Sequence, residues 1–162
     1  FQKTIAAWRG VWRRFEILTK PESAVTIVND YAHHPTAIKG TLEGAKKFFP
    51  GRRVFAVFQP HHHNRLTALF DDFTKAFDAA DEIIIAEVYT VAGRQPEAGD
   101  TKTGKALADA LLELHKQTTY APNPADASGQ ILNIVRPGDV VIIMGAGDIW
   151  TIGETLAKHY DQ

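Results

Sequence analysis

The sequence predicts an α/β domain of three layers, in which a mainly parallel sheet lies between helices on both faces. Two observations support this prediction. Strand-like and helix-like segments alternate along the 162 residues with short turns between them, which is typical of parallel sheets. The strand-like segments are also continuous apolar runs, as expected when helices cover both faces of a sheet. The length fits a single domain.

The predicted strands are apolar runs bounded by turn residues. "GDVVIIMG" is the clearest of them, because its apolar run is uninterrupted between two glycines. The predicted strands cover residues 24–32, 52–59, 82–89, 118–121 and 138–145.

Helices are predicted between these strands. Apolar residues recur at helical spacing over residues 35–49, with Pro35 suited to the first turn and Pro50-Gly51 ending the helix. A second helix is predicted over residues 64–80, with Asn64 as its N-cap.

Three further helices complete the pattern. Two are predicted over residues 103–116 and 124–135. For the last helix, Thr151 and Glu154 have the spacing of a capping box, and the helix is expected to end near His159.

The first 20 residues fit the alternating pattern poorly. "IAAWRGVWRRFEIL" resembles the end of another unit that feeds an edge strand, so residues 1–20 are expected to form a domain junction. Because the chain does not begin with Met, we also expect it to be a piece of a longer protein.

Composition narrows the function classes. The formal charge is −1, which gives no electrostatic reason to expect a nucleic-acid or membrane partner. The chain has no cysteine, which excludes disulfides and thiolate metal sites and favours a reducing compartment. No apolar run approaches the ~20 residues of a membrane span.

The unusual polar clusters follow the predicted strands directly. They are "HHP" at 33–35, "PHHHNR" at 60–65, "TVAGRQPEAGD" at 90–100 and "GAGD" at 145–148. The carboxyl ends of parallel strands share one edge, and open α/β sheets bind ligands there. Five of the seven histidines are thereby placed on that edge, which predicts a site, although polar loops are also ordinary surface features.

The histidine run raises the alternative of a metal site. His33, His61 and His63 could hold one ion, as in a metal-dependent hydrolase, only if the first two loops meet. Neighbouring residues of a strand face opposite ways, so consecutive histidines do not easily share an ion, and we predict no metal site. His115 and His159 are expected at helix ends, where a cation suits the helix dipole.

"GAGDIW" is not a standard nucleotide loop. Trp150 stands where the third glycine of G-x-G-x-x-G would be, and the chain has no G-x-x-x-x-G-K-[ST]. Gly145 and Gly147 can still allow close backbone approach, and amides at a helix start suit a carboxylate or phosphate. Alternatively, the two glycines only make a tight turn.

Four charged residues beside these loops have both functional and ordinary interpretations. Arg65 opens a helix and can bind a carboxylate with two hydrogen bonds, or it is a solvated surface charge. Asp30 ends the first strand and can accept hydrogen bonds from a ribose, or it caps the next turn. Arg13 and Arg14 can bind phosphate, or they are charges at a strand edge.

Four motifs taken together resemble one family. "RRFE" (13–16), "NDYAHHPTAI" (29–38), "VFQPH…R" (57–65) and "GAGDIW" (145–150) follow in the order found in the C-terminal domain of the Mur ligases. The resemblance runs from about Trp8 to the end of the chain. "EVYTVAGRQPEAG" is similar to a further loop of that family, which more usually has Asp in place of Glu87.

The resemblance implies a fold and an activity. The chain would be the third domain of a Mur ligase, Rossmann-like, closing over a missing central domain that carries the P-loop and binds most of the ATP and Mg²⁺. ATP would phosphorylate the carboxylate of UDP-N-acetylmuramate, and the amine of L-alanine would attack to form an amide. This implies peptidoglycan precursor synthesis in the bacterial cytoplasm, and an isolated fragment that is inactive.

Within the family, "FQPH" followed by Arg favours the member that adds alanine. The alternative is the member that attaches a recycled murein tripeptide, which shares an "AHHPTAI"-like stretch but differs in its second motif.

Residue roles follow from the same resemblance. Arg14 would reach the ATP phosphates, and Asp30 would hold the ribose. Tyr31 would face both ATP and the amino acid. His33 is implied as the catalytic residue.

The amino acid would be held by the second motif. The resemblance assigns it His61, His62 and Arg65, with Arg65 pairing its carboxylate. His62 and His63 depart from the family, which usually has an Arg and then an aromatic residue there, so a permanent charge is replaced by an imidazole. Residues Gly145, Gly147 and Asp148 would form a loop near the substrate.

Overall fold

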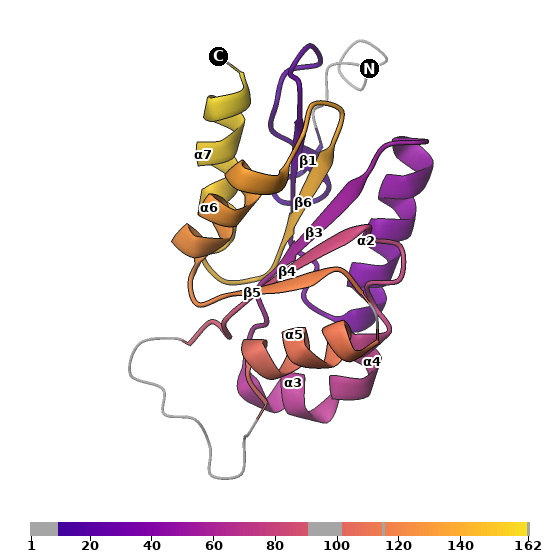
Figure 1. Cartoon of the computed structure of the whole chain (residues 1–162), viewed down its shortest axis with the longest axis vertical. Helices are drawn as coiled ribbons and strands as arrows, with labels where there is room; N and C mark the ends of the chain where they lie inside the picture. The colour runs from indigo at the N-terminus through magenta and orange to yellow at the C-terminus, as the bar shows by residue number, and fades with distance from the viewer. Residues whose placement is uncertain (1–9, 91–101, 115, 162) are drawn as a thin grey trace.

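In the computed structural model, which describes residues 10–90, 102–114 and 116–161, six strands form one sheet in the order β1-β2-β6-β3-β4-β5 (Figure 1). β1 pairs with β2 in the antiparallel sense, and the other four pairs are parallel. The strands are β1 (Glu16–Ile17), β2 (Thr26–Asp30), β3 (Val54–Phe58), β4 (Glu82–Ala86), β5 (Thr118–Ala121) and β6 (Val140–Met144).

Helices cover both faces of the sheet, so the predicted three-layer α/β architecture is confirmed (Figure 1). α2, α3, α4 and α5 pack on one face, and α6 and α7 pack on the other. The helices are α2 (Pro35–Phe48), α3 (His63–Ala68), α4 (Phe70–Thr74), α5 (Gly104–Glu113), α6 (Pro124–Ile134) and α7 (Trp150–Tyr160).

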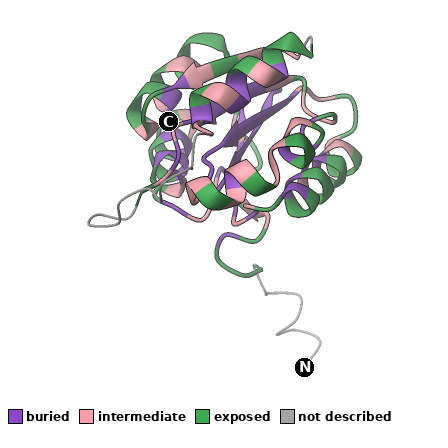
Figure 2. Cartoon of the chain, turned by 90° about the horizontal axis from the view of Figure 1, so that it is seen from below, coloured by how far each residue is buried: buried purple, intermediate pink, exposed green. Residues whose placement is uncertain are grey.

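The core lies on the two faces of the central strands. Every residue of β3 and β6 is buried, since their side chains alternate between the two helical layers. Figure 2 shows this arrangement as buried strands between helices whose outer faces are exposed. Phe55 and Phe58 belong to opposite layers, and each is fully buried.

The helix predicted over residues 64–80 is wrong as a continuous element. The chain forms α3 and α4 instead, broken at Leu69, whose φ and ψ are −116° and 22°. Asp71 and Asp72 lie in the first turn of α4, where acidic side chains stabilise a new helix N-terminus. The N-cap of α3 is His62 rather than Asn64.

The capping box predicted for the last helix is also wrong. α7 begins at Trp150 with Ile149 as its N-cap, so Thr151 already lies inside the helix. The Thr151 hydroxyl donates instead to the carbonyl of Asp148, at 2.8 Å. The helix ends at Tyr160, with His159 in its last turn as predicted.

β1 is an edge strand, as predicted for the segment that precedes β2. Glu16 pairs with Asn29 and Ile17 pairs with Val28. Within residues 10–90, 102–114 and 116–161, no helix is long and apolar enough to cross a membrane.

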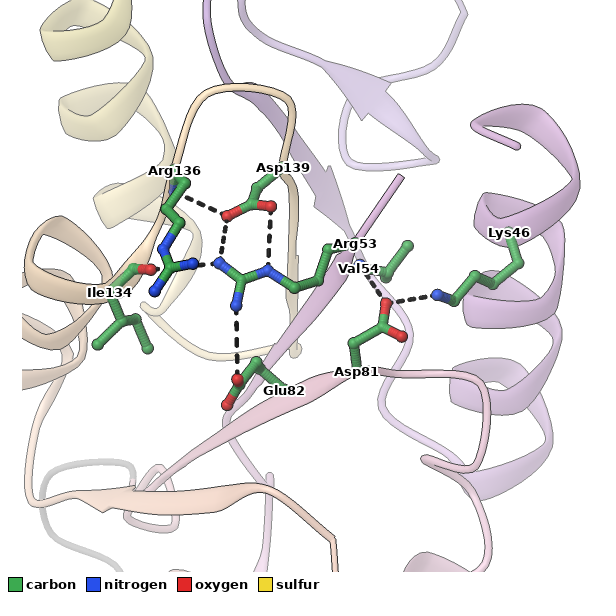
Figure 3. Close-up of polar contacts among 8 residues, drawn as sticks. All are labelled: Lys46, Arg53, Val54, Asp81, Glu82, Ile134, Arg136 and Asp139. Atoms are coloured by element: carbon green, nitrogen blue, oxygen red, sulfur yellow. Dashed lines mark hydrogen bonds and ion pairs between the residues drawn. The ribbon is translucent and has the colours of Figure 1, made fainter. Parts of the chain in front are cut away.

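Charged side chains of opposite sign pair with one another at the amino edge of the sheet, where the parallel strands begin. Figure 3 shows Arg53 between Asp139 and Glu82. Its Nε and Nη2 donate to the two carboxylate oxygens of Asp139 at 3.1 and 2.7 Å, and its Nη1 lies 3.6 Å from Glu82. Nearby, Asp81 accepts from the amide of Val54 at 2.6 Å and pairs with Lys46.

Candidate active site at the carboxyl edge

The register of the sheet brings three predicted loops together at its carboxyl edge. Asp30 of β2 and Phe58 of β3 both lie opposite Met144 of β6. The next residues continue this contact, because the amide of Gln59 donates to the Met144 carbonyl at 3.1 Å. The loops that carry the five histidines and "GAGD" therefore begin side by side, as the sequence predicted.

His33 has a defined tautomer. Its Nδ1 lies 2.8 Å from the carbonyl oxygen of Tyr31, which can only accept a hydrogen bond. Nδ1 therefore carries the proton, and Nε2 of the neutral ring is left as an acceptor. The rings of Tyr31 and His33 also meet edge to face, 5.1 Å apart. A half-buried imidazole fixed in this way can accept a proton at Nε2.

His61 is held in its neutral form. Burial, together with the electrostatic influence of His62, Arg65 and His33, lowers its pKa to about 4. The ring stacks on Tyr89 at 5.4 Å and meets the His62 ring at 3.9 Å. His61 therefore contacts both Tyr89 and His62, and His33 and Arg65 are near enough to influence its ionisation.

His62 and His63 start α3 in different ways. His62 has φ 70° and ψ 122°, a left-handed backbone that side chains rarely adopt. Such strain often lies at functional sites. His63 uses Nδ1 to donate to the carbonyl of Lys102 at 3.0 Å, which ties α3 to the segment before α5.

The His-based metal site was the alternative interpretation of this cluster. In the part of the chain that the structure describes, no group of three or more His, Asp or Glu side chains is arranged to hold a metal ion.

The Asp30 carboxylate already accepts hydrogen bonds from other residues of the protein. Its Oδ2 accepts from the amide of Phe15 at 2.7 Å, and its Oδ1 accepts from the amide of Ala32 at 2.8 Å and from the Thr41 hydroxyl at 3.4 Å. The carboxylate ties the β1 segment to the end of β2. A carboxylate has about four acceptor sites, so one ribose hydroxyl can still be accommodated. Ribose binding by Asp30 stays a prediction.

Arg13 and Arg14 both lie near the Tyr31 ring, but they differ in exposure. Arg14 is exposed, and its guanidinium carbon lies 5.3 Å from the centre of the Tyr31 ring. Arg13 is 4% exposed, lies 4.8 Å from the same ring and donates through Nη2 to the carbonyl of Gly145. Burial lowers the pKa of Arg13, although the charges of Tyr31 and Asp30 oppose this. Exposure therefore favours Arg14, rather than Arg13, as the ligand-binding arginine.

The glycines of "GAGD" are required by close packing within the protein. A Cβ on Gly147 would lie 2.5 Å from Cγ of Tyr89 and 2.6 Å from Oε1 of Gln59. Gly145 has φ 150°, and a Cβ there would lie 2.9 Å from a methyl group of Ile149. Packing against neighbouring residues therefore requires glycine at both positions. Their proximity to substrate, with that of the exposed Asp148, stays a prediction.

Glu87 has a structural role at this edge. Burial raises its pKa, but hydrogen bonds from the amides of Val88 and Gly104, both 2.8 Å, outweigh burial and bring it below its ordinary value. The Tyr120 hydroxyl donates to its other oxygen at 2.7 Å. The carboxylate thereby joins β4, β5 and the start of α5, where Gly104 leaves no room for a Cβ.

One residue at the site, Gln59, was not assigned a role by the sequence. Gln59 is 4% exposed and bonded to the "GAGD" loop, to which Arg13 is also bonded. A polar side chain inside an otherwise apolar motif such as "VFQPH" was the available sign of Gln59. The predicted loop residues 91–100 and His115 lie outside the described residues.

Comparisons with known proteins agree with this geometry. A family model described as "Mur ligase, glutamate ligase domain" matches residues 13–147. The chain is 40% identical over 161 residues to the UDP-N-acetylmuramate–L-alanine ligase of Sulfurihydrogenibium sp., covering 99% of this chain and 34% of that protein. This chain thus spans about a third of the length of that curated relative.

Solved structures give the same picture. The crystal structure of a UDP-N-acetylmuramate-alanine ligase from Thermotoga maritima matches with a TM-score of 0.76 and 30% identity, over 98% of this chain and 32% of that one. A murein peptide ligase from Psychrobacter arcticus matches with a TM-score of 0.68 and 23% identity, over 99% of this chain and 32% of that one. The second likeness supports the fold alone.

Proposed function

This chain belongs to the glutamate ligase domain family of the Mur ligases, and we propose that the full-length protein joins L-alanine to UDP-N-acetylmuramate with ATP. The observation that carries the proposal is the cluster of His33, His61 and Arg65 at one sheet edge. Arg65 carries a permanent positive charge close to neutral His61, and an anionic ligand can pair with that charge. The alanine carboxylate and the phosphates of ATP are such ligands.

The proposed reaction has two steps. The γ-phosphoryl group of ATP passes to the carboxylate of UDP-N-acetylmuramate and gives an acyl phosphate and ADP. The alanine amine then attacks the acyl carbon, the amide bond forms, and phosphate leaves. The attacking amine loses a proton, which Nε2 of His33 is oriented to accept, because Nδ1 is occupied by the Tyr31 carbonyl.

The other residues of the cluster bind and orient the reactants. Arg65, in the first turn of α3, pairs the alanine carboxylate, while His62 and neutral His61 line the same subsite. Exposed Arg14 reaches the ATP phosphates, and Asp30 and Tyr31 take the ribose side of the nucleotide. When bound, Mg²⁺ would supply neutralisation of phosphate charge, and the upstream domains of the full-length protein would mainly hold it. The reaction is proposed to take place in the bacterial cytoplasm.

The experiment is phosphate release by the full-length protein with ATP, Mg²⁺ and UDP-N-acetylmuramate, with and without amino acid. The proposal expects release that depends on L-alanine. Serine, glycine and the murein tripeptide are tested in parallel, because His62 stands where an arginine is usual in the family. Preference for the tripeptide would favour the recycling ligase, and release that no amino acid changes would refute the proposal.

The domain alone supplies the control. Residues 1–162 lack a P-loop motif, so the isolated domain is expected to release no phosphate under the same conditions. Turnover by the isolated domain would contradict its role as one part of a composite site.

A further inference from the structure

We propose that Gln59 is a positioning residue that holds the histidine loop, residues 60–65, and the glycine loop, residues 145–149, in one fixed arrangement. This inference rests on the proposed function, because it concerns how the alanine subsite is shaped. Gln59 is the first residue after β3 and leads directly into the histidine loop.

The Gln59 side chain binds the glycine loop at two points. Its Nε2 donates to Oδ1 of Asp148 at 3.0 Å, and its Oε1 accepts from the amide of Ile149 at 3.2 Å. Its own amide donates to the carbonyl of Met144, at 3.1 Å. A side chain that is 4% exposed and satisfied by these bonds has little freedom to move.

Packing removes the remaining freedom between the two loops. Gly147 fits against both the Gln59 amide oxygen and the Tyr89 ring, where a Cβ would lie at 2.6 and 2.5 Å. Tyr89 in turn stacks on His61 at 5.4 Å and donates its amide to the carbonyl of Pro60 at 2.8 Å. Gln59, Gly147, Tyr89 and His61 therefore form a continuous chain of contacts.

The chemistry of the site requires an amide at residue 59. An amide donates from Nε2 and accepts at Oε1, which matches the carboxylate of Asp148 and the N–H of Ile149. A glutamate there would face the Asp148 carboxylate with another carboxylate. The glycine loop would then move, Tyr89 would follow, and the neutral His61 that lines the alanine subsite would lose its support.

The test is Gln59→Glu in the full-length protein, measured by alanine-dependent phosphate release. We expect the KM for L-alanine to rise about tenfold or more, the factor for disrupting a hydrogen bond to a charged group. The KM for ATP and kcat should change by less than about threefold, since the described contacts of Gln59 involve neither Arg14 nor His33. An unchanged alanine KM would overturn the inference.

A rescue experiment separates positioning from general damage. Asp148→Asn keeps a carbonyl that can accept from Gln59, and it provides an amide that can donate to a glutamate at residue 59. Gln59→Glu should therefore raise the alanine KM by less than about threefold in the Asp148→Asn background. An equal rise in both backgrounds would overturn the inference. Gln59→Met, which has similar length and no hydrogen bonds, should raise the alanine KM in both backgrounds.

A spectroscopic measurement tests the inference without relying on the ligase activity of the protein. In imidazole NMR spectra of the full-length protein, the His61 resonance should shift in Gln59→Glu and return in Gln59→Glu/Asp148→Asn. A resonance that stays in place in every variant would contradict the coupling of the loops. If the unmodified protein shows no ligase activity, the proposed function fails, and this readout alone decides the inference.

Discussion

The two edges of the sheet use charged residues in opposite ways. At the amino edge, Arg53 is bonded to Asp139 and paired with Glu82, so charges of opposite sign are neutralised within the fold (Figure 3). At the carboxyl edge, His61 lies among groups that all lower its pKa, namely His62, Arg65 and His33. The amino edge therefore pairs its charges within the fold, whereas the carboxyl edge holds Arg65 near neutral His61, and we infer from this difference where an anionic ligand binds.

The largest effect should come from His33 at the carboxyl edge. His33→Gln removes the proton acceptor at Nε2, and kcat of the full-length protein should fall about 10²–10⁴-fold, the usual contribution of a general base. The matched control is His34→Asn, since exposed His34 caps α2 and asparagine is a good N-cap. Equal losses of kcat in both variants would refute the role of His33.

A substitution at the amino edge should change the stability of the protein rather than its activity. Asp139→Asn loses a buried carboxylate that accepts from Arg53 and from the Arg136 amide, so we expect the free energy of unfolding to fall by about 2 kcal/mol. Chemical denaturation measures this loss, and the alanine KM of the folded enzyme should not change. A changed KM would show that the two edges are not independent.

Asp139 should also contribute to the acid sensitivity of the domain. Burial raises its pKa, but the hydrogen bonds from Arg53 and Arg136 outweigh burial and hold it below 3.8. A carboxylate whose pKa is lower in the folded state than in the unfolded state stabilises the protein above pH 4. This stabilisation is lost as the pH falls through the pKa of the folded state. Asp139→Asn should therefore flatten the decline in stability below pH 4.

Gly147 offers a steric test of the carboxyl edge. Gly147→Ala would place a Cβ 2.5 Å from Tyr89, so the free energy of unfolding should fall by about 1–3 kcal/mol, as for other overpacked sites. Gly129→Ala in α6 is the control, because nothing lies within 4 Å and alanine favours a helix by about 0.5–1 kcal/mol. Thermal denaturation of both variants distinguishes packing at the loop from a general effect of alanine.

The ionisation of His61 gives a smaller effect that NMR can follow. Its imidazole should titrate with a midpoint near 4, where burial and the neighbouring cations place its pKa. Because the unfolded chain binds this proton at higher pH, stability should decline as the pH falls from about 6.5 towards 4, and His61→Gln should reduce that decline. A midpoint near the ordinary value would contradict the crowded, buried site.

The location of the site could be predicted from the sequence, but its internal bonds could not. The carboxyl ends of parallel strands lie at the same edge of a sheet. The alternation of strands and helices along the chain was therefore enough to place His33, His61 and Gly145 at one edge. The bond between Gln59 and Asp148 joins residues 89 positions apart, and that between Arg13 and Gly145 spans 132. Such contacts depend on tertiary packing, which local patterns do not contain.

The same reason explains the errors in the helices. Apolar spacing over residues 64–80 is continuous, but the backbone breaks at Leu69, while residues on both sides of the break pack into the same core. The left-handed φ of His62 is equally invisible in the sequence, because a histidine rarely adopts it without support from its surroundings.

The most direct measurement of the central claim compares one arginine from each edge in the full-length protein. The apparent KM for L-alanine is measured for Arg65→Lys and for Arg53→Lys, because lysine keeps the charge and loses the planar fork that binds a carboxylate. The account predicts about a tenfold higher KM for Arg65→Lys, and an unchanged KM with lower stability for Arg53→Lys. Equal KM values for Arg65→Lys and the unmodified enzyme would contradict it.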